Sequence, residues 1–421
     1  MSKLLIRNGT VVDPAANLQA PRDVVIENGQ IAALLEPGSA EAATAAANAQ
    51  TTVDATGLLV TPGMIDLHVH IFSSFSHYGV DVDPSCLARG VTTVLDAGSA
   101  GAQTYPAFKR YVIDVSDTRV FALLNISNIG MVPGAETDPP LGELDYLPFL
   151  NVPAALDCIE ANRDTILGIK LRLSRNLAAD GRNEPQALDL ALEAAEAARL
   201  PVMVHFAKSS VPIETLLPRL RPGDLLTHCY HPHESGILDR DGKVYPVVLD
   251  AVERGVLLDV GHGRGAFSWQ VARTAMGQDL WPNTISSDLH QYNIQGPVFD
   301  LATTVSKLLH LGMPLLEALR RVTATPAQVL GMAGQIGTLQ PGAEADIALL
   351  EAAEGDFALT DITGAVEIAG RKLIPRGVYR AGKPYTGPTE QYTDHNPPWY
   401  HGRFRYPPVQ TPAYGHGHTH G

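Results

Sequence analysis

The feature that most constrains this chain is a series of apolar segments that begins near residue 60 and alternates with longer polar or helical segments. The segments have the length of strands but lack strict alternation of apolar and polar residues, so they are predicted to be buried on both faces. They read LLVTPGMIDLHVH, GVTTVLDAG, RVFALLNIS, ILGIKLRLS, PVMVHF, LLTHCYH, VLLDVGHG and TISSDLH. Eight buried strands that alternate with helices predict parallel βα units closing into a (β/α)8 barrel, an α/β fold.

One helix of the predicted outer layer is clear in the sequence. Residues 183–200, NEPQALDLALEAAEAARL, are rich in good helix formers. Asn183 is predicted to cap this helix, and Pro185 falls in its first turn, where proline is tolerated. The helix leads directly into the segment PVMVHF, as an outer helix of a barrel should.

Both ends of the chain have a different pattern, of short strands separated by turns. Residues 1–60 contain KLLIRNGTVVDP and RDVVIENGQIAALLE, in which Asn28-Gly29 is a strong hairpin dipeptide. The segment GSAEAATAAANAQ fits a helical turn or a surface loop equally well. Residues 336–383, with GTLQPGAEADIALLE and VEIAGRKLIPRGVYRAG, again predict short strands. We therefore expect a small β-sandwich formed by residues 1–60 and 336–383 beside a barrel of residues 61–335.

Composition limits the classes of partner. The 421 residues carry a formal charge of −14, which argues against a nucleic-acid surface or an anionic membrane. The sequence shows no long apolar span or signal peptide, and Cys86, Cys158 and Cys229 are scattered without disulfide or metal-site spacing. We expect a cytoplasmic homo-oligomer that acts on a small molecule. Residues 384–421, rich in Pro, Tyr, His and Gly, predict an extended tail without a catalytic role.

Metal-binding residue types stand at the ends of the predicted strands. His68 and His70 are two residues apart, so both imidazoles lie on the same face of a strand. In parallel barrels the active site lies at the C-terminal ends of the strands. Four more candidates occupy that position on later strands: Lys170 in GIKLRLS, His205 in VMVHF, His228 in LLTHC and Asp288 in ISSDLH.

Each of these residues also has an ordinary structural explanation. His205 and His228 could be hydrogen-bonded core histidines, and Asp288 could cap a helix. Lys170 is harder to explain, because an unpaired ammonium buried in a barrel strand is costly. Since the ordinary explanations would have to hold at five strand ends together, we favour a metal site.

The motif GMIDLHVH, followed by lysine, histidine, histidine and aspartate on later strands, resembles the amidohydrolase superfamily, in the subgroup in which a carboxylated lysine bridges two metal ions. The resemblance covers essentially the whole chain, because the split β-domain and VTATPAQVLGM followed by GTLQPGAEADIALLE are also features of that family. The segments GIKLRLS, GHGRGAFSW and PNTISSDLH are most similar to its deacetylase-type, dihydroorotase-like members.

The resemblance implies a cofactor and a mechanism. Two divalent ions about 3.5 to 4 Å apart would share a hydroxide that attacks the substrate carbonyl, with Asp288 as general acid/base. Zn²⁺ is the expected ion, although the ligand set also suits Mn²⁺, Co²⁺ and Ni²⁺. The implied ligands are His68, His70 and Asp288 for one ion, His205 and His228 for the other, and Lys170, as a carbamate formed with CO2, as the bridge.

Substrate contacts are predicted at the same end of the barrel. Arg172 shares a strand face with Lys170, and GHGRGAFSW brings His262 and Arg264 after the seventh strand. Either arginine could form a bidentate contact with a substrate carboxylate, and for each a structural salt bridge is an equal alternative. Other loop histidines near strand ends carry no comparable signal: His231, His233 and His290.

The expected function is hydrolysis of an acyl amide or ester. Cyclic-amide hydrolases, such as dihydroorotases and hydantoinases, use the same six ligands and are the main alternative. Deaminases of the superfamily use a glutamate shortly after the fifth-strand histidine, but here that segment is HFAKSS. A scaffold homologue that has lost catalysis need not keep its ligands, whereas this chain keeps all six.

Overall fold

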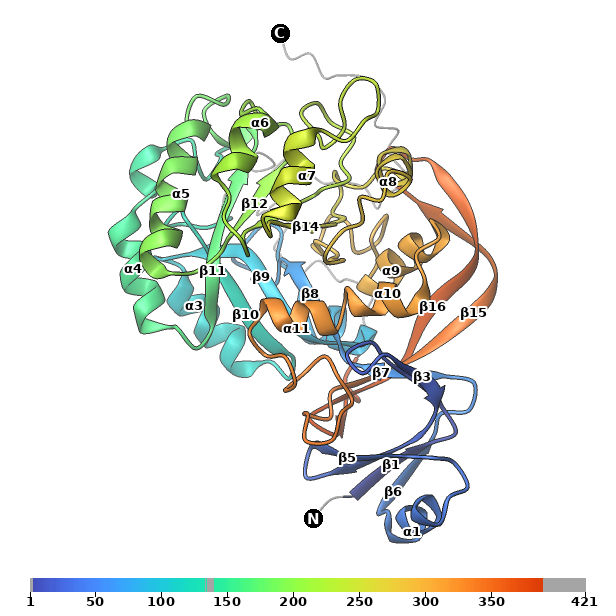
Figure 1. Ribbon diagram of the computed structural model, residues 1–421. Coiled ribbons are helices and arrows are strands. Elements are labelled where there is room, and N and C mark those ends of the chain that lie inside the picture. The colour runs from blue at the N-terminus through green and yellow to red at the C-terminus, as the bar shows by residue number, and fades with distance from the viewer. Residues whose placement is uncertain (1–2, 133, 135–139, 389–421) are drawn as a thin grey trace.

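A barrel ringed by helices and a β-rich unit at one end of it make up the computed structural model, which describes residues 3–132, 134 and 140–388 (Figure 1). Within this described part, the barrel sheet has seven parallel strands in chain order. They are β8 (Met64–Val69), β9 (Val91–Gly101), β10 (Arg119–Asn125), β11 (Ile166–Leu173), β12 (Val202–Phe206), β13 (Leu225–Thr227) and β14 (Leu257–Asp259).

The eighth predicted strand, TISSDLH, closes the barrel without being a continuous strand. A parallel bridge joins Asp259 of β14 to Thr284, and another joins Val69 of β8 to Leu289. The buried carboxylate of Asp66 also accepts a hydrogen bond from the backbone N–H of Ser287, at 3.0 Å. The predicted (β/α)8 barrel is therefore confirmed.

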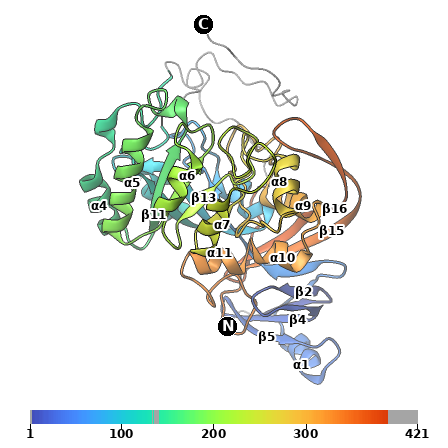
Figure 2. The same cartoon turned by 45° about the horizontal axis from the view of Figure 1, so that its top comes forward.

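Helices cover the outside of the barrel (Figure 2). In chain order they are α2 (Val82–Ser85), α3 (Tyr105–Tyr111), α4 (Val152–Ala161), α5 (Glu184–Ala198), α6 (Ile213–Leu216), α7 (Pro246–Glu253), α8 (Trp269–Met276), α9 (Leu301–His310) and α10 (Leu315–Arg320). The helix predicted after residue 183 is α5, and Asn183 stands at its N-cap position, but its side chain makes no capping hydrogen bond. Its amide instead donates to the carbonyls of Leu144 and Asp145, at 2.8 and 3.0 Å.

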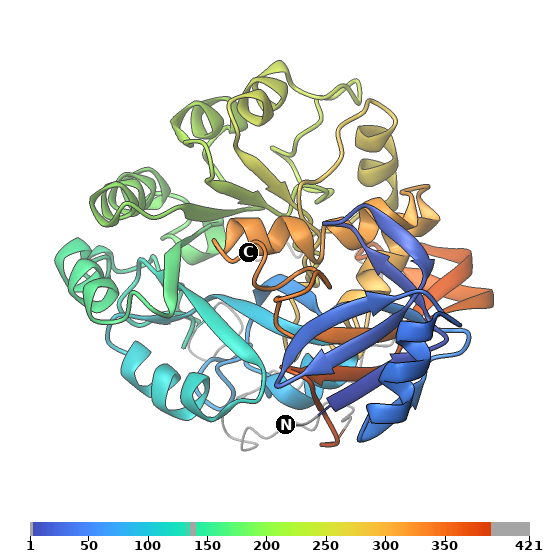
Figure 3. The same cartoon turned by 60° about the horizontal axis from the view of Figure 1, so that its bottom comes forward.

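The lower end of the barrel is closed by α11 (Ala324–Val329), which crosses it in Figure 3. Ala327 of this helix and the following Leu330 pack into one apolar cluster with inward-facing residues of the strands, among them Leu67, Leu123 and Met203. Because this end is filled, the opposite end, where the strands finish, is the open one.

Two sheets at the chain ends form the predicted β-sandwich. The first contains β1 (Lys3–Arg7), β4 (Asp23–Glu27), β5 (Gln30–Leu35) and β6 (Thr51–Asp54). The second contains β2 (Thr10–Asp13), β3 (Leu18–Pro21), β7 (Leu59–Pro62), β15 (Ile347–Thr360), β16 (Val366–Arg380) and β17 (Lys383–Pro384). The sheets share one apolar core, to which Ile6 and Ile26 of the first and Val60 and Ile347 of the second belong.

Local turns in the sandwich follow the sequence. Asn28 and Gly29 connect β4 to β5 with φ values of 53° and 82°, the left-handed conformation expected of this dipeptide. The alanine-rich segment forms α1 (Ala40–Asn48), and the side chain of Ser39 accepts a hydrogen bond from the N–H of Ala42 at its start.

The strands β15 and β16 differ from the short strands expected there. They are 14 and 15 residues long and pair antiparallel, with register shifts near Leu350 and between Glu354 and Phe357. Figures 1 and 2 show this hairpin leaving the sandwich and following the side of the barrel toward α8. One end of the hairpin therefore lies in the sandwich and the other lies beside the barrel.

Two expectations concern the chain as a whole. Most of the tail predicted for residues 384–421 lies outside the described residues, which end at 388. Within the described residues, no helix combines the length and the apolar character needed to cross a membrane.

Candidate metal centre

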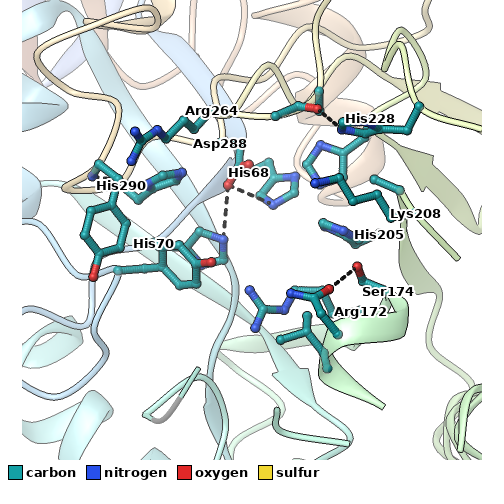
Figure 4. Close-up of a pocket in the computed structure, with 18 of the residues that line it drawn as sticks. His68, His70, Arg172, Ser174, His205, Lys208, His228, Arg264, Asp288 and His290 are labelled. Carbon is teal, nitrogen blue, oxygen red and sulfur yellow. Dashed lines mark hydrogen bonds and ion pairs between the residues drawn. The ribbon is translucent and has the colours of Figure 1, made fainter. Parts of the chain in front are cut away.

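The strand ends surround a cavity of about 220 Å³ at the open end of the barrel. Figure 4 shows side chains from several strands pointing into it. All six predicted ligands line this cavity: His68, His70, Lys170, His205, His228 and Asp288.

Two histidines of the first strand converge on one carboxylate. His68 lies within β8, and His70 follows directly after it, so both rings reach the C-terminal end of the strand. Oδ1 of Asp288 lies 3.4 Å from Nε2 of His68 and 3.1 Å from Nε2 of His70 (Figure 4). Ligand atoms from these three residues lie within 4.8 Å of one another, a spacing that suits a shared metal ion.

The other two histidines form a neighbouring pair. His205 is in β12 and His228 directly follows β13, and their ring centroids are 4.3 Å apart. The ring of His228 is also 5.1 Å from that of His68, so the two groups of histidines adjoin. The backbone is left-handed at His228 and at Asp288, with φ values of 69° and 49°. Such strained positions concentrate at functional sites.

Lys170 is a fully buried residue of the cavity wall. Its side chain is fully buried in β11, and Nζ lies 3.1 Å from Nε2 of His68 and 3.4 Å from the sulfur of Met203. Burial lowers the pKa of Lys170 to about 7. A substantial fraction of the amine is therefore neutral at neutral pH, and a neutral amine is the form that can react as a nucleophile.

Hydrogen bonds behind the ligands fix the tautomer of His68. The hydroxyl of Thr227 donates to Oδ2 of Asp259, at 2.7 Å, and its oxygen lies 2.9 Å from Nδ1 of His68. Because the hydroxyl hydrogen is used on Asp259, the oxygen must accept, so Nδ1 of His68 carries the hydrogen. Nε2 then presents a lone pair to the cavity.

The tautomers of His228 and His70 follow in the same way from the hydrogen bonds of their Nδ1 atoms. Nδ1 of His228 donates to the carbonyl of Gly261, at 2.6 Å. Nδ1 of His70 lies 3.0 Å from the hydroxyl of Ser99, which in turn hydrogen-bonds the carboxylate of Asp96. In both rings Nε2 is left with a lone pair that faces the cavity.

The protonation states agree with this arrangement. Burial lowers the pKa of His68, that of His70 and that of His205 below the usual histidine value, and it lowers the pKa of His228 to about 3. The four rings are therefore neutral at neutral pH, and neutral imidazole is the form that binds metal ions.

The residues fit a bound cation. The lone pairs of two histidines point at a carboxylate oxygen only 3.1 and 3.4 Å away, an arrangement that is repulsive unless a positive charge lies between them. Among the described residues, Nε2 of His228 and Oδ1 of Asp288 are buried without a hydrogen-bond donor. Buried polar atoms left unpaired at a site are expected where an ion completes it.

Glycines leave the space that the site requires. A Cβ added to Gly98 would lie 2.5 Å from Cβ of Lys170, and one added to Gly263 would lie 2.3 Å from Oδ2 of Asp288. Both glycines also have left-handed backbones, with φ values of 84° and 53°. The backbone can therefore approach the candidate ligands as closely as it does only without a side chain.

Positive side chains dominate the rest of the cavity wall. Arg172, Lys208 and Arg264 line it together with Lys170, whereas Asp288 is the one carboxylate among the described lining residues. The charge of Arg172 is offset by the buried Glu143, so Lys208 and Arg264 are the lining cations that favour an anionic substrate.

For Arg172 the structure shows the structural salt bridge that the sequence left open as the equal alternative to a substrate contact. Its Nε and Nη2 donate to the two carboxylate oxygens of the buried Glu143, at 2.6 and 2.7 Å. Its guanidinium also lies 5.3 Å from the ring centre of Tyr78. The Nε and Nη2 donors that could bind a substrate carboxylate in a bidentate way are therefore bonded to Glu143. Nothing in the sequence indicates Glu143 as a partner.

His262 does not reach the cavity. It is fully buried, and its Nδ1 donates to the carbonyl of Gly263, at 2.9 Å. Its Nε2 accepts from Nζ of Lys307, at 2.6 Å. The predicted substrate contact is wrong for this residue, because both ring nitrogens bond within the protein.

Comparison with known proteins identifies the family. Residues 224–384 match the amidohydrolase family. A deacetylase from Brucella anthropi is 35% identical over 328 residues, which are 77% of this chain and 79% of the relative. The chain belongs to the amidohydrolase family.

Solved structures agree with the barrel fold. This amidohydrolase superposes on a crystal structure of an adenine deaminase with a TM-score of 0.81 and 32% identity. The match covers 91% of this chain and 100% of the deaminase chain. A crystal structure of a dihydroorotase covers 91% and 98%, with a TM-score of 0.80 and 31% identity. The chain is therefore a hydrolase, but its relatives differ in the reaction that they are named for.

Some lining residues of this amidohydrolase carried no usable signal in the sequence. Lys208 follows β12 by two residues and resembles any solvated loop lysine. His290 lines the cavity and accepts the N–H of Tyr292 at Nδ1, at 3.2 Å, so Nε2 carries the hydrogen. Tyr78 packs on its ring, with centroids 4.9 Å apart, and Tyr292 adds a second aromatic wall. These contacts depend on loop conformations that periodicity does not encode.

Proposed function

We propose that this amidohydrolase removes an acyl group from an amide or ester whose other part carries a negative charge. The observation that carries the proposal is the convergence of His68, His70 and Asp288, whose ligand atoms lie within 4.8 Å of one another. The deacetylase named among its relatives supports the acyl substrate.

Two divalent ions, with Zn²⁺ as the first candidate, suit the donors present. His68, His70 and Asp288 would hold one ion, and His205 and His228 the other. When bound, the ions would lower the pKa of a water molecule and polarise the substrate carbonyl.

Lys170 would bridge the two ions as a carbamate. Its buried amine, with a pKa of about 7, is neutral often enough to add to CO2 and lose one proton. The new N–C bond turns a cation into an anion, which removes a positive charge from a site that must accept cations. The neighbouring Nε2 of His68, at 3.1 Å, supports this position for the bridge.

Asp288 would move the proton of the reaction. Its side chain remains 13% exposed at the cavity, whereas that of His68 is 1% exposed. The carboxylate would accept a proton from the attacking water and return it to the leaving nitrogen or oxygen. The N–H of His290 would donate to the substrate from the same side of the cavity.

Arg264 and Lys208 are the cations proposed to recognise the charged part of the substrate. Both line the cavity, and the arginine can form two parallel hydrogen bonds with a carboxylate. Tyr78 and Tyr292 would pack against the apolar part of the same molecule.

A panel of substrates tests the reaction. Initial rates would be compared for N-acetyl amino acids, acetylated hydroxy acids, a hydantoin, dihydroorotate and adenine. We expect kcat/KM to be highest for the acetylated acids. Preference for the cyclic amides would favour the dihydroorotase or hydantoinase type, and release of ammonia from adenine would favour deamination.

Metal analysis separates an enzyme from an inactive scaffold. Purified protein should contain close to two divalent ions per chain, and Lys170→Ala should lose metal and activity together. Lys208→Ala is the matched control and should keep the metal, because it removes a lysine from the cavity wall and not from the centre. A metal-free native protein with an unmodified Lys170 would contradict the mechanism.

A further inference from the structure

A second fully buried lysine lies outside the candidate metal centre. Lys307 is in α9, and its side chain has no solvent exposure. Nζ contacts three acceptors, namely Nε2 of His262 at 2.6 Å, the carbonyl of Pro297 at 2.8 Å and the carbonyl of Thr360 at 2.7 Å. An ammonium has three N–H donors, so each has one partner.

The three acceptors belong to segments that are distant in the sequence. His262 follows β14, Pro297 lies between Asp288 and α9, and Thr360 ends β15. Lys307 therefore joins two loops at the open end of the barrel to the far end of the hairpin that leaves the sandwich. Figure 1 shows this hairpin, β15 and β16, passing beside α9 on its way toward α8.

The ring of His262 is fixed in one orientation by these contacts. Nδ1 donates to the carbonyl of Gly263, so Nε2 has the lone pair that Lys307 requires. The ring stacks on Phe267 with centroids 4.7 Å apart and planes 16° apart. Nζ of Lys307 also lies 5.7 Å from the centre of the Phe267 ring.

His262 belongs to a short segment that carries a proposed substrate contact. We call residues 261–266 the arginine loop, because Arg264 lies within it and lines the cavity. The loop is bonded on both sides of this residue. The N–H of Gly263 donates to the carbonyl of Ser287, at 3.0 Å, and the carbonyl of Gly265 accepts from Nε2 of His233, at 2.8 Å.

We infer that Lys307 is a positioning residue that holds the arginine loop, through His262, in the conformation in which Arg264 binds an anionic substrate. The part of this inference that concerns substrate rests on the proposed function. The lysine itself does not line the cavity, so it acts through the loop and not on the reacting atoms.

A comparison of an anionic and a neutral substrate tests whether Lys307 positions Arg264 or only stabilises the fold. Lys307→Met removes the three donors while keeping a long apolar side chain. With metal-loaded protein we expect KM for an anionic acetylated acid to rise about tenfold and kcat to change less than about twofold. KM for the matching neutral methyl ester should change less than about twofold. In an Arg264→Gln background, Lys307→Met should add no further increase.

Two further variants keep the test informative. His262→Phe retains the stacking on Phe267 but removes the acceptor, so it should reproduce the effect if Lys307→Met does not fold. Lys372→Met is the control, because Lys372 lies on the same hairpin and contacts the Phe299 ring, 6.0 Å from Nζ, rather than the arginine loop.

Hydrogen exchange supplies a readout independent of activity. Amides of residues 261–266 should exchange about tenfold faster in Lys307→Met and in His262→Phe than in the wild type, while those of β8 stay unchanged. If the wild type hydrolyses none of the acyl substrates, the proposed function fails, and the exchange rates still decide the role of Lys307. Unchanged exchange in the loop, or equal effects on the anionic and the neutral substrate, would overturn the inference.

Discussion

Gly263 is the residue at which backbone conformation and candidate chemistry meet most closely. Its φ is +53°, and a Cβ would lie 2.3 Å from Oδ2 of Asp288. Gly263→Ala should therefore displace the carboxylate, and we expect kcat/KM to fall about 100-fold, the effect of a misplacement near 1 Å. Steady-state kinetics on metal-loaded protein would measure this loss.

The control for backbone strain is Gly223, which has φ +87° but nothing within 4 Å of an added Cβ. Gly223→Ala should destabilise the protein by about 1 kcal/mol and leave kcat/KM within about twofold. Equal losses of activity in the two variants would mean that strain, and not the contact with Asp288, explains the effect.

Thr227 orients a candidate ligand without lining the cavity. Its oxygen accepts from Nδ1 of His68 while its hydroxyl donates to Asp259. Thr227→Val keeps the shape and removes both hydrogen bonds, so metal affinity should fall 10- to 100-fold, on the order seen for outer ligands of metal sites. Competition with a chelator of known affinity would measure it.

Thr284 offers the matched comparison. It donates to the same aspartate, at 2.7 Å, but His68 is not its partner in the described structure. Thr284→Val should weaken metal binding much less than Thr227→Val. A similar loss in both variants would assign the effect to the charge of Asp259 rather than to the ring of His68.

The ligand-type residues could be predicted because each stands at a strand end, where one short motif fixes its position. Arg172 and His262 could not, since their partners are distant in the sequence. Glu143 lies 29 residues from Arg172, and Lys307 lies 45 residues from His262. Nothing in GIKLRLS or GHGRGAFSW indicates that these side chains are hydrogen-bonded to other residues of the protein.

At the level of elements, α9 carries a charge whose burial should appear in the pH dependence of stability. Burial lowers the pKa of Lys307 from 10.5 to about 7, while Asp361 and Asp300 raise it and Lys372 lowers it. Between these pH values the unfolded chain binds one more proton than the folded chain at this group. The group's contribution to the free energy of unfolding therefore rises with pH across this window.

Lys307→Met isolates this contribution. The free energy of unfolding of the wild type, minus that of the variant, should rise from pH 7 toward 10.5 by up to about 1.4 kcal/mol per pH unit. Urea titrations at several pH values would measure the difference. A difference that stays flat over this range would mean that Lys307 keeps its usual pKa.

Elements were predictable where the hydrophobic pattern was simple. The apolar runs identified the strands β8 to β14. The eighth segment forms only isolated bridges and no continuous strand, because its backbone turns at Asp288, where φ is 49°. The strands β15 and β16 are longer than the sequence predicted, because their register shifts interrupt the alternation of apolar and polar residues that indicates a long strand. Asn183 looks like a helix cap, but contacts with the loop at residues 144–145 take its side chain away.

Within the described residues, we expect the apolar core between the two sheets of the sandwich to respond to metal differently from the apolar clusters of the barrel. One cluster fills the sandwich, whereas separate clusters fill the barrel and its outer layer. The candidate ligands belong to the barrel alone. Loss of metal should therefore loosen the strand ends around the cavity and leave the sandwich intact.

Chelation tests this at the scale of the fold. A ligand present at 100 times its Kd stabilises the folded state by about 2.7 kcal/mol, so removal of two ions should lower Tm by about 5 °C in a chain of this size. Without the ions, the carboxylate of Asp288 and the lone pairs of two histidines face each other at 3.1 and 3.4 Å. Scanning calorimetry with and without chelator would measure the shift.

In Lys170→Ala, which should bind little metal, the shift in Tm on adding chelator should fall to less than about half of the wild-type shift. Hydrogen exchange should increase at the end of β8 and stay constant in β1 and β4, and uniform loosening of both cores would show that the metal supports the whole chain rather than the barrel.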